Sequence, residues 1–131
     1  MNIRVLLIDR HDDARTTLAR RLRRDPRLEL AGEASSVEEA EAILPGARPD
    51  IVLLDIYGHG GRGVEACRAL CRLTEAPVVV FTSFMTPDLW DAVKEAGAAD
   101  YLLKHVDTDR LSREVFRLAE RHRVRPLANR P

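Results

Sequence analysis

The sequence lacks most of the features that mark membrane, metal-cluster and nucleic-acid-binding proteins. None of its apolar runs approaches the roughly 20 residues that a membrane span needs, and no basic segment leads into a cleavable apolar stretch. It has two cysteines, Cys67 and Cys71, without further soft ligands nearby, so their spacing of four predicts small core-facing helix residues and no zinc site. The 21 basic and 21 acidic residues balance, so net charge indicates no nucleic-acid partner. We expect a cytoplasmic protein without a membrane segment.

What the chain does contain is a regular alternation of short apolar runs and amphipathic stretches. Five strands alternating with five helices predict an α/β fold, a doubly wound five-stranded parallel sheet of the flavodoxin-like (βα)5 type with strand order 2-1-3-4-5. At 131 residues the chain is long enough for one such domain. The predicted strands are 3–8, 28–34, 50–55, 78–83 and 100–104.

Helix boundaries are marked by capping and breaking residues. A serine followed three residues later by glutamate is a capping box, and proline at the first helical position or glycine after the last one bounds a helix. The marks are Asp25-Pro26 at the end of the first helix, Ser35 or Ser36 with Glu38 or Glu39 at the start of the second, Pro45-Gly46 at its end, Thr86-Pro87 and Gly97 around the fourth, and Asp107 or Thr108 before the fifth.

Four polar residues stand at or just past the carboxyl ends of the predicted strands: Asp9, Asp55, Thr82 and Lys104. In a doubly wound sheet these ends share one edge, and ligands bind there near the point where strand order reverses. Asp55, at the end of the central strand, could act as a nucleophile toward phosphorus. Lys104 could supply a fixed positive charge, Thr82 a hydroxyl donor, and Mg²⁺ held by Asp9 and Asp55 further charge.

These residues lie in motifs that resemble those of the response regulator receiver domains. The motifs are VLLID ending at Asp9, PDIVLLD ending at Asp55, VVVFTS with Thr82 and GAADYLLKH with Lys104, and they follow one another in the family's order. The resemblance covers residues 2 to 122, and YLLK and GEAS are most similar to receivers that precede a LuxR-type helix-turn-helix (the NarL/LuxR subclass).

The resemblance implies a role for each residue. Asp55 would be the phosphoacceptor for a histidine kinase, Lys104 would pair with the phosphoryl group, and Thr82 would move toward it on activation. Tyr101 would be the switch aromatic that follows Thr82, and the backbone carbonyl of Tyr57 would join Asp9 and Asp55 as a Mg²⁺ ligand. Such a domain is not a true enzyme; at most it catalyses slow phosphotransfer and dephosphorylation of itself.

The resemblance also implies how the chain is organised. Residues 1–122 would form the receiver, and 123–131 a tail or the start of a linker to an output domain absent from this chain. Phosphorylation would change the surface of the last two helices and the last strand. A homodimer could form there, with Phe84, Met85 and Trp90 at the interface, although these side chains could equally pack in the core. DNA would be contacted only through the output domain.

The main departure from the family pattern is Arg10, which replaces the second of two consecutive acids. Asp9, Arg10, Asp55 and Lys104 carry no formal net charge, whereas three acids and a lysine would attract a divalent cation. One charge pair at about 4 Å is worth roughly 4 kcal/mol at an effective dielectric near 20, so this change predicts weakened or absent Mg²⁺ binding.

Three arrangements of Arg10 are open. Arg10 could ion-pair with Asp55 or Asp9 in place of the metal. Asp12 or Asp13 could reach back and restore the second carboxylate. Alternatively, Arg10 could point to solvent while Asp12 or Asp13 caps the first helix.

The loop IYGHGGRG after Asp55 contains a formal Gly-x-Gly-x-x-Gly from Gly58 to Gly63. It is no dinucleotide fingerprint, because Asp55 would repel a pyrophosphate and Ser83, not an acid, lies at the next strand end. His59 and His105 are expected to be exposed, although His59 could contact a phosphoryl group.

Three functions are therefore distinguished. The first is a phosphorylated receiver. The second is a phosphorylation-independent pseudo-receiver that binds other proteins, which Arg10 supports and the retained Asp55, Thr82 and Lys104 oppose. The third is a flavin- or nucleotide-binding enzyme, which the missing phosphate-binding loop opposes.

Overall fold

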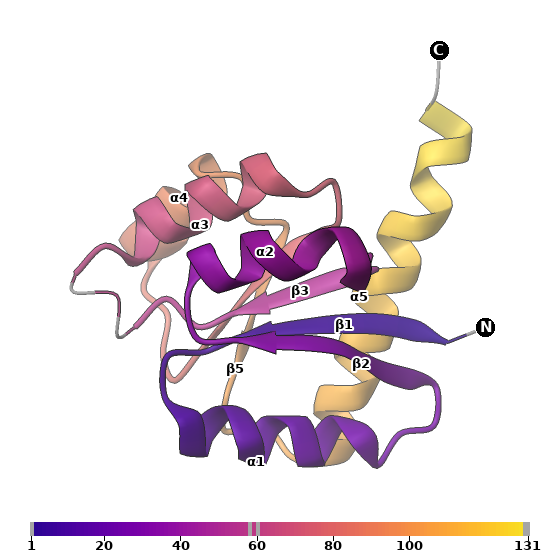
Figure 1. The fold of residues 1–131 in the computed structure, drawn as a ribbon. Helices are drawn as coiled ribbons and strands as arrows, with labels where there is room; N and C mark the ends of the chain where they lie inside the picture. Colours follow the sequence, from indigo (N-terminus) through magenta and orange to yellow (C-terminus); the bar gives the residue numbers. More distant parts are fainter. Residues whose placement is uncertain (1, 58, 60, 130–131) are drawn as a thin grey trace.

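The chain folds into a central parallel sheet with helices on both faces (Figure 1). The computed structural model describes residues 2–57, 59 and 61–129, with side chains to residue 122. The strands and helices alternate along the chain. They are β1 (Ile3–Ile8), α1 (Asp12–Arg23), β2 (Leu28–Ala34), α2 (Val37–Ala47), β3 (Ile51–Leu54), α3 (Gly63–Leu73), β4 (Val78–Thr82), α4 (Pro87–Glu95), β5 (Asp100–Leu103) and α5 (Thr108–Asn129).

The strand order is β2-β1-β3-β4-β5, which confirms the predicted fold class and topology. All four neighbouring pairs are parallel. The order reverses between β1 and β3, and in such sheets ligands bind beyond the carboxyl ends of the strands at this point. In Figure 1 these ends lie at the left of the sheet.

Two apolar layers cover the sheet, because side chains alternate between the faces of each strand. Along β1, Ile3, Val5 and Leu7 pack with α1 and α5, whereas Leu6 and Ile8 pack with α2, α3 and α4. The continuous apolar runs of the sequence follow from this arrangement, since a strand covered on both faces needs apolar residues at consecutive positions. Cys67 is buried on α3 and Cys71 is half-buried beside it, as the spacing predicted.

Most of the predicted helix boundaries are confirmed. Ser36 caps α2 by accepting a hydrogen bond from the Glu39 amide at 3.1 Å, and Thr86 caps α4 in the same way. The end of α2 differs from the prediction, because the helix continues past Pro45-Gly46 to Ala47. The left-handed turn that ends it falls on Arg48, at φ 42°, whose amide bonds to the Leu44 carbonyl.

The capping predicted for α1 is wrong, whereas that for α5 is confirmed. His11, not Asp12 or Asp13, is the N-cap residue of α1, and its side chain accepts no cap hydrogen bond. Asp12 and Asp13 lie in the first turn, where negative charge favours the helix dipole. Asp107 accepts from the amide of Arg110 at 2.8 Å and so caps α5.

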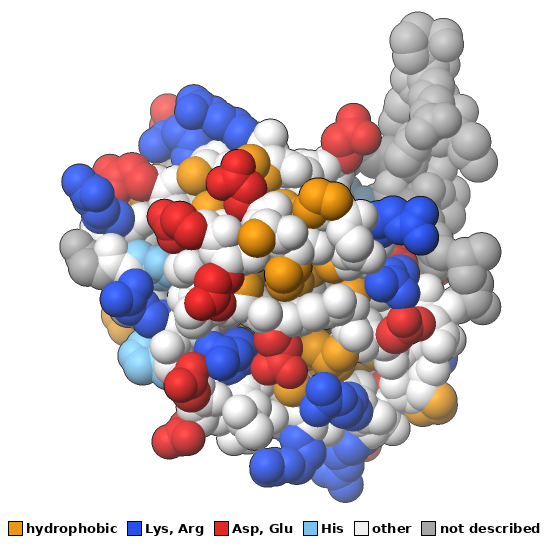
Figure 2. Space-filling model, viewed as in Figure 1, with side chains coloured by type: hydrophobic (Ala, Val, Ile, Leu, Met, Phe, Trp, Pro, Cys, Tyr) orange, Lys and Arg blue, Asp and Glu red, His pale blue; other side chains and the backbone are white. Residues whose placement is uncertain are grey.

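Charged side chains of both signs are interspersed over the surface (Figure 2). In that view, histidine side chains reach the surface at the edge of the molecule where the strands have their carboxyl ends. Within the part of the chain that the structure describes, no helix combines the length and apolarity needed to cross a membrane.

Candidate functional site

Two carboxylates lie buried at the reversal point of the sheet. Asp9 directly follows β1 and Asp55 directly follows β3, and their side chains are only 3% and 4% exposed. The strand ladders extend into this edge, since the Asp9 amide bonds to the Ala34 carbonyl and the Asp55 amide to the Ile8 carbonyl. The predicted convergence of these two acids is thus observed.

Lys104 joins both carboxylates. Its Nζ lies 2.8 Å from Oδ2 of Asp55 and 3.1 Å from Oδ2 of Asp9. A buried acid costs little free energy only when its charge is compensated, and here one ammonium compensates two acids. If all three groups are ionised, the buried part of the pocket keeps a net negative charge.

The pKa of Lys104 reflects this position. Burial on its own would lower it, but the hydrogen bonds and charges of Asp55, and then of Asp9, raise it above its ordinary value. Lys104 therefore stays an ammonium at neutral pH and serves as a fixed positive charge beside Asp55.

Arg21 of α1 holds the loop that carries Lys104. Its Nη2 donates to the Val106 carbonyl at 2.5 Å, its Nη1 to the Lys104 carbonyl at 3.4 Å and its Nε to Thr108 Oγ1 at 3.1 Å. Three donors of one guanidinium therefore tie α1 to the segment between β5 and α5. The sequence analysis missed this residue, because nothing in its spacing along α1 indicates a partner more than 80 residues away.

Backbone amides orient the two carboxylates. Oδ1 of Asp9 accepts from the amide of His11 at 2.9 Å, and Oδ1 of Asp55 accepts from the amide of Tyr57 at 3.0 Å. Each acid thus forms a local turn with the residue two positions on, which is typical of aspartate in loops. The remaining oxygen of each acid is left to face Lys104.

Thr82 and Lys104 lie on adjacent segments, because the Lys104 amide bonds to the Thr82 carbonyl at 2.8 Å. Thr82 is fully buried, and its hydroxyl donates to the Phe84 carbonyl at 3.2 Å. Tyr101 is half-buried on β5, and its ring contacts Trp90 of α4 at a centroid distance of 5.2 Å. A contact therefore connects the β5 aromatic with α4.

The structure decides between the arrangements of Arg10. Arg10 is exposed, and no ion pair joins it to Asp9 or Asp55 among the described residues. Asp12 does not return to the pocket either, since its side chain is 82% exposed and pairs with Arg15 at 2.9 Å. Asp13 is also exposed. Of the three open arrangements, the structure therefore agrees with the one in which Arg10 points to solvent, although neither Asp12 nor Asp13 caps α1.

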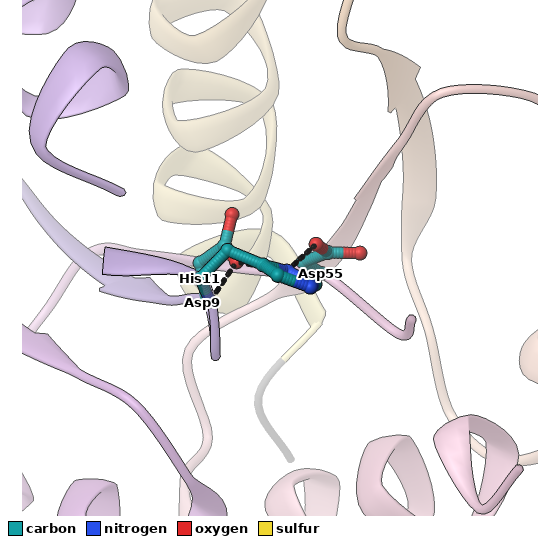
Figure 3. A group of neighbouring side chains, drawn as sticks. All are labelled: Asp9, His11 and Asp55. Atoms are coloured by element: carbon teal, nitrogen blue, oxygen red, sulfur yellow. Dashed lines mark hydrogen bonds and ion pairs between the residues drawn. The ribbon is translucent and has the colours of Figure 1, made fainter. Parts of the chain in front are cut away.

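His11 is a second site residue that the sequence analysis missed. Its Nδ1 lies 3.4 Å from Oδ1 of Asp9 and 4.0 Å from Oδ2 of Asp55. Figure 3 shows the three side chains pointing toward one another. The sequence feature that could have identified His11 is its position two residues after Asp9, where the chain leaves β1 and turns into α1.

His59 also differs from expectation. It is half-buried instead of exposed, and its Nε2 lies 2.8 Å from the backbone oxygen of Asp55. Its ring is therefore held against the strand end, whereas His105 is exposed as predicted. Gly63 has a packing role, since a Cβ there would lie 2.2 Å from the Ile56 carbonyl oxygen. Close approach of α3 to the segment that follows β3 thus explains the last glycine of the Gly-x-Gly-x-x-Gly pattern.

An α/β domain with a lysine-bridged acidic pocket at its reversal point is a scaffold for handling a phosphoryl group or a divalent cation. Residues 5–116 match the family model of the response regulator receiver domain, and the chain belongs to that family.

Sequence similarity to known relatives agrees with this family assignment. The chain is 43% identical over 103 residues to the transcriptional regulatory protein LiaR of Bacillus subtilis, covering 78% of this chain and 49% of LiaR. It is 38% identical over 115 residues to the DNA-binding transcriptional activator DevR/DosR of Mycobacterium tuberculosis, covering 86% of this chain and 52% of that protein. It thus spans about half the length of these curated relatives, which are response regulators of the LuxR/NarL type.

Solved structures show the same fold. A two-component response regulator of the LuxR family from Aurantimonas superposes with a TM-score of 0.81 at 27% identity, covering 92% of this chain and 86% of that one. The receiver domain of the putative regulator NarL from Mycobacterium tuberculosis gives a TM-score of 0.80 at 24% identity, covering 91% and 97%.

Receiver domains generally bind Mg²⁺, and the residues of this pocket meet the minimum for that ion. Mg²⁺ uses one or two carboxylates and fills its other positions with water and phosphate oxygens. Asp9 and Asp55 provide two carboxylates, whereas Arg10 supplies no oxygen where the family usually has an acid. The two acids of the pocket therefore fit a divalent cation.

Proposed function

We propose that Asp55 accepts a phosphoryl group from the phosphohistidine of a cytoplasmic histidine kinase. A carboxylate oxygen of Asp55 attacks phosphorus, and the phosphorus–nitrogen bond breaks. The leaving imidazole keeps the electron pair of that bond and takes a proton from water. The observation that carries this proposal is the ammonium of Lys104, 2.8 Å from a buried Asp55 in a chain of the receiver family. Asp55 is a phosphoacceptor, with at most slow self-catalysed transfer and hydrolysis.

The neighbours of Asp55 fit the two tasks of phosphoryl transfer, which are positioning and compensation of charge. Lys104 would move its hydrogen bond from the Asp55 carboxylate to a phosphoryl oxygen. The hydroxyl of Thr82 would leave the Phe84 carbonyl and donate to another phosphoryl oxygen. Mg²⁺, when bound by Asp9, Asp55 and the carbonyl of Tyr57, would supply further positive charge, and we propose that Arg10 weakens this binding.

The output would follow through Tyr101. Its ring contacts Trp90, so movement of Thr82 within β4 would be passed to the packing of α4 against β5. We propose that the α4-β5-α5 surface thereby changes and controls self-association or a DNA-binding output domain. Relatives named as transcriptional regulators, of whose length the match to this chain covers about half, support such an output domain. Residues 1–122 would be the receiver and 123–131 would lead toward that domain.

Trp90 provides the test, since it is the single tryptophan of the chain. Its fluorescence would be followed while the protein is incubated with a small-molecule acyl phosphate. We expect a change in the unmodified protein, no change in Asp55→Asn, and a reduced change in Thr82→Ala despite phosphorylation. A change of equal size in Asp55→Asn would contradict the proposal.

A phosphorylation-independent interaction module is the second candidate, and Arg10 in place of an acid is the observation that favours it. This candidate predicts that Asp55→Asn leaves partner binding and transcriptional output unchanged. The phosphoacceptor predicts that this variant loses its response to the kinase.

A further inference from the structure

His11 brings a nitrogen donor to a pocket that otherwise offers oxygen donors from acids. The ligating atoms of Asp9, His11 and Asp55 all lie within 4.8 Å of one another, and among the described residues they form the group that could hold a metal ion (Figure 3). Two features fix the backbone of His11 beside Asp9. His11 is the N-cap of α1, and its amide donates to Oδ1 of Asp9.

The spacing of these atoms is close to that of a coordination sphere. Bonds of about 2.0–2.2 Å to nitrogen and carboxylate oxygen place two tetrahedral ligands about 3.4 Å apart. The distance from His11 Nδ1 to Asp9 Oδ1 is 3.4 Å, and that to Asp55 Oδ2 is 4.0 Å. The His11 side chain is 60% exposed, so it can turn by the few tenths of an ångström that the longer distance requires.

The hydrogen bonds with Lys104 leave lone pairs on both acids that could bind a metal ion. Each ionised carboxylate offers about four lone-pair sites. Lys104 takes one site on Oδ2 of Asp55 and one on Oδ2 of Asp9, and backbone amides take one on each Oδ1. Lone pairs remain on both acids, and the exposed side of the His11 ring leaves space for water.

The kind of donor decides which ion is preferred. Mg²⁺ selects oxygen ligands and loses its water reluctantly, whereas imidazole suits first-row transition-metal ions such as Co²⁺, Ni²⁺ and Zn²⁺. Arg10 supplies no oxygen ligand where the family usually has an acid, and His11 supplies a nitrogen donor beside the two acids. Both features favour a transition-metal ion over Mg²⁺.

We propose, building on the proposed function, that His11 is a third metal ligand of this pocket, which makes it selective for a borderline transition-metal ion over Mg²⁺. In the neutral imidazole, Nδ1 would donate its lone pair to the ion and Nε2 would carry the proton. Asp9 and Asp55 would supply the oxygen ligands.

The test uses the whole chain without a polyhistidine tag and without a phosphodonor. Co²⁺ and Mg²⁺ would be titrated by calorimetry, and Co²⁺ binding would also be followed by its visible absorption, which reports nitrogen ligation. His11→Gln keeps the size of the side chain, and His105→Gln is the matched control on an exposed histidine. We expect His11→Gln to raise the Kd for Co²⁺ at least about tenfold and that for Mg²⁺ less than about threefold. His105→Gln should bind both ions like the unmodified protein.

An unchanged Kd and absorption spectrum for Co²⁺ in His11→Gln would overturn the proposal. So would full Co²⁺ binding in Asp9→Asn, because the ion would then lie elsewhere. The outcome is separable from that of phosphorylation: a protein that binds Co²⁺ through His11 and never gains a phosphoryl group disproves the proposed function alone. A protein that is phosphorylated while His11→Gln binds Co²⁺ normally disproves the metal ligand alone.

Discussion

Replacement of Lys104 by methionine tests how the buried acids are stabilised. The substitution keeps the unbranched apolar stem of the side chain but removes the ammonium that Asp9 and Asp55 share at 3.1 and 2.8 Å. At an effective dielectric near 20, each contact is worth about 5–6 kcal/mol before the cost of desolvation is subtracted. Removing one partner of a buried ion pair costs about 3–5 kcal/mol. Because the Lys104 side chain is 23% exposed, we expect the lower end of this range, a decrease of about 3 kcal/mol in the free energy of unfolding.

Urea denaturation followed by circular dichroism measures this loss. With a slope of about 2 kcal/mol per molar urea, the midpoint should fall by about 1.5 M at an unchanged slope. The chain offers a matched control, since Lys94 and Lys104 are its two lysines. Lys94 is exposed on α4, so Lys94→Met should change stability by less than about 1 kcal/mol.

A second substitution separates charge from packing. In the Lys104→Met background, Asp9→Asn removes one of the two uncompensated acids and should recover at least about 1 kcal/mol. A loss under about 0.5 kcal/mol for Lys104→Met, or no recovery in the double variant, would refute the role assigned to the ammonium.

Three further predictions concern stability. Contact with Asp55 and Asp9 raises the pKa of Lys104 in the folded protein. The contribution of Lys104 to stability is therefore complete below its unfolded pKa of about 10.4, and it is lost as the pH rises through the higher folded pKa. The difference in Tm between the unmodified protein and Lys104→Met should accordingly close at alkaline pH. Gly63→Ala places a Cβ 2.2 Å from a backbone oxygen and should cost about 2 kcal/mol or more in urea unfolding, whereas Gly46→Ala meets no atom within 4 Å and should not destabilise. Ser36→Ala removes the side-chain cap of α2 and should lower stability by about 1 kcal/mol in the same assay.

The order of the elements could be read from the sequence because the central strands β1, β3 and β4 are covered on both faces. Continuous apolar runs such as that of β1, and the capping pairs at Ser36 and Thr86, are local signals that the tertiary structure preserves. The helix α2 ends one residue beyond the predicted Pro45-Gly46, since a proline in the last turn does not stop a helix. There the decisive feature is the backbone of Arg48 at φ 42°, which its residue type does not predict.

The acids and the lysine of the pocket were also predictable, because polar residues at the ends of parallel strands share one edge. The direction of Arg10 was not, since it depends on how the chain turns from β1 into α1. The same turn places His11 beside Asp9 and Asp55. Arg21 was missed for a related reason, as its partners lie between β5 and α5 and are near it only in the folded chain.

The most direct test of the central claim is the intact mass of the protein after incubation with a small-molecule acyl phosphate, with and without Mg²⁺. We predict a gain of one phosphoryl group that is lost in Asp55→Asn and retained in Asp12→Asn, a control on an exposed acid. No gain in the unmodified protein under either condition, or a gain that persists in Asp55→Asn, would contradict the assignment of Asp55 as the phosphoacceptor.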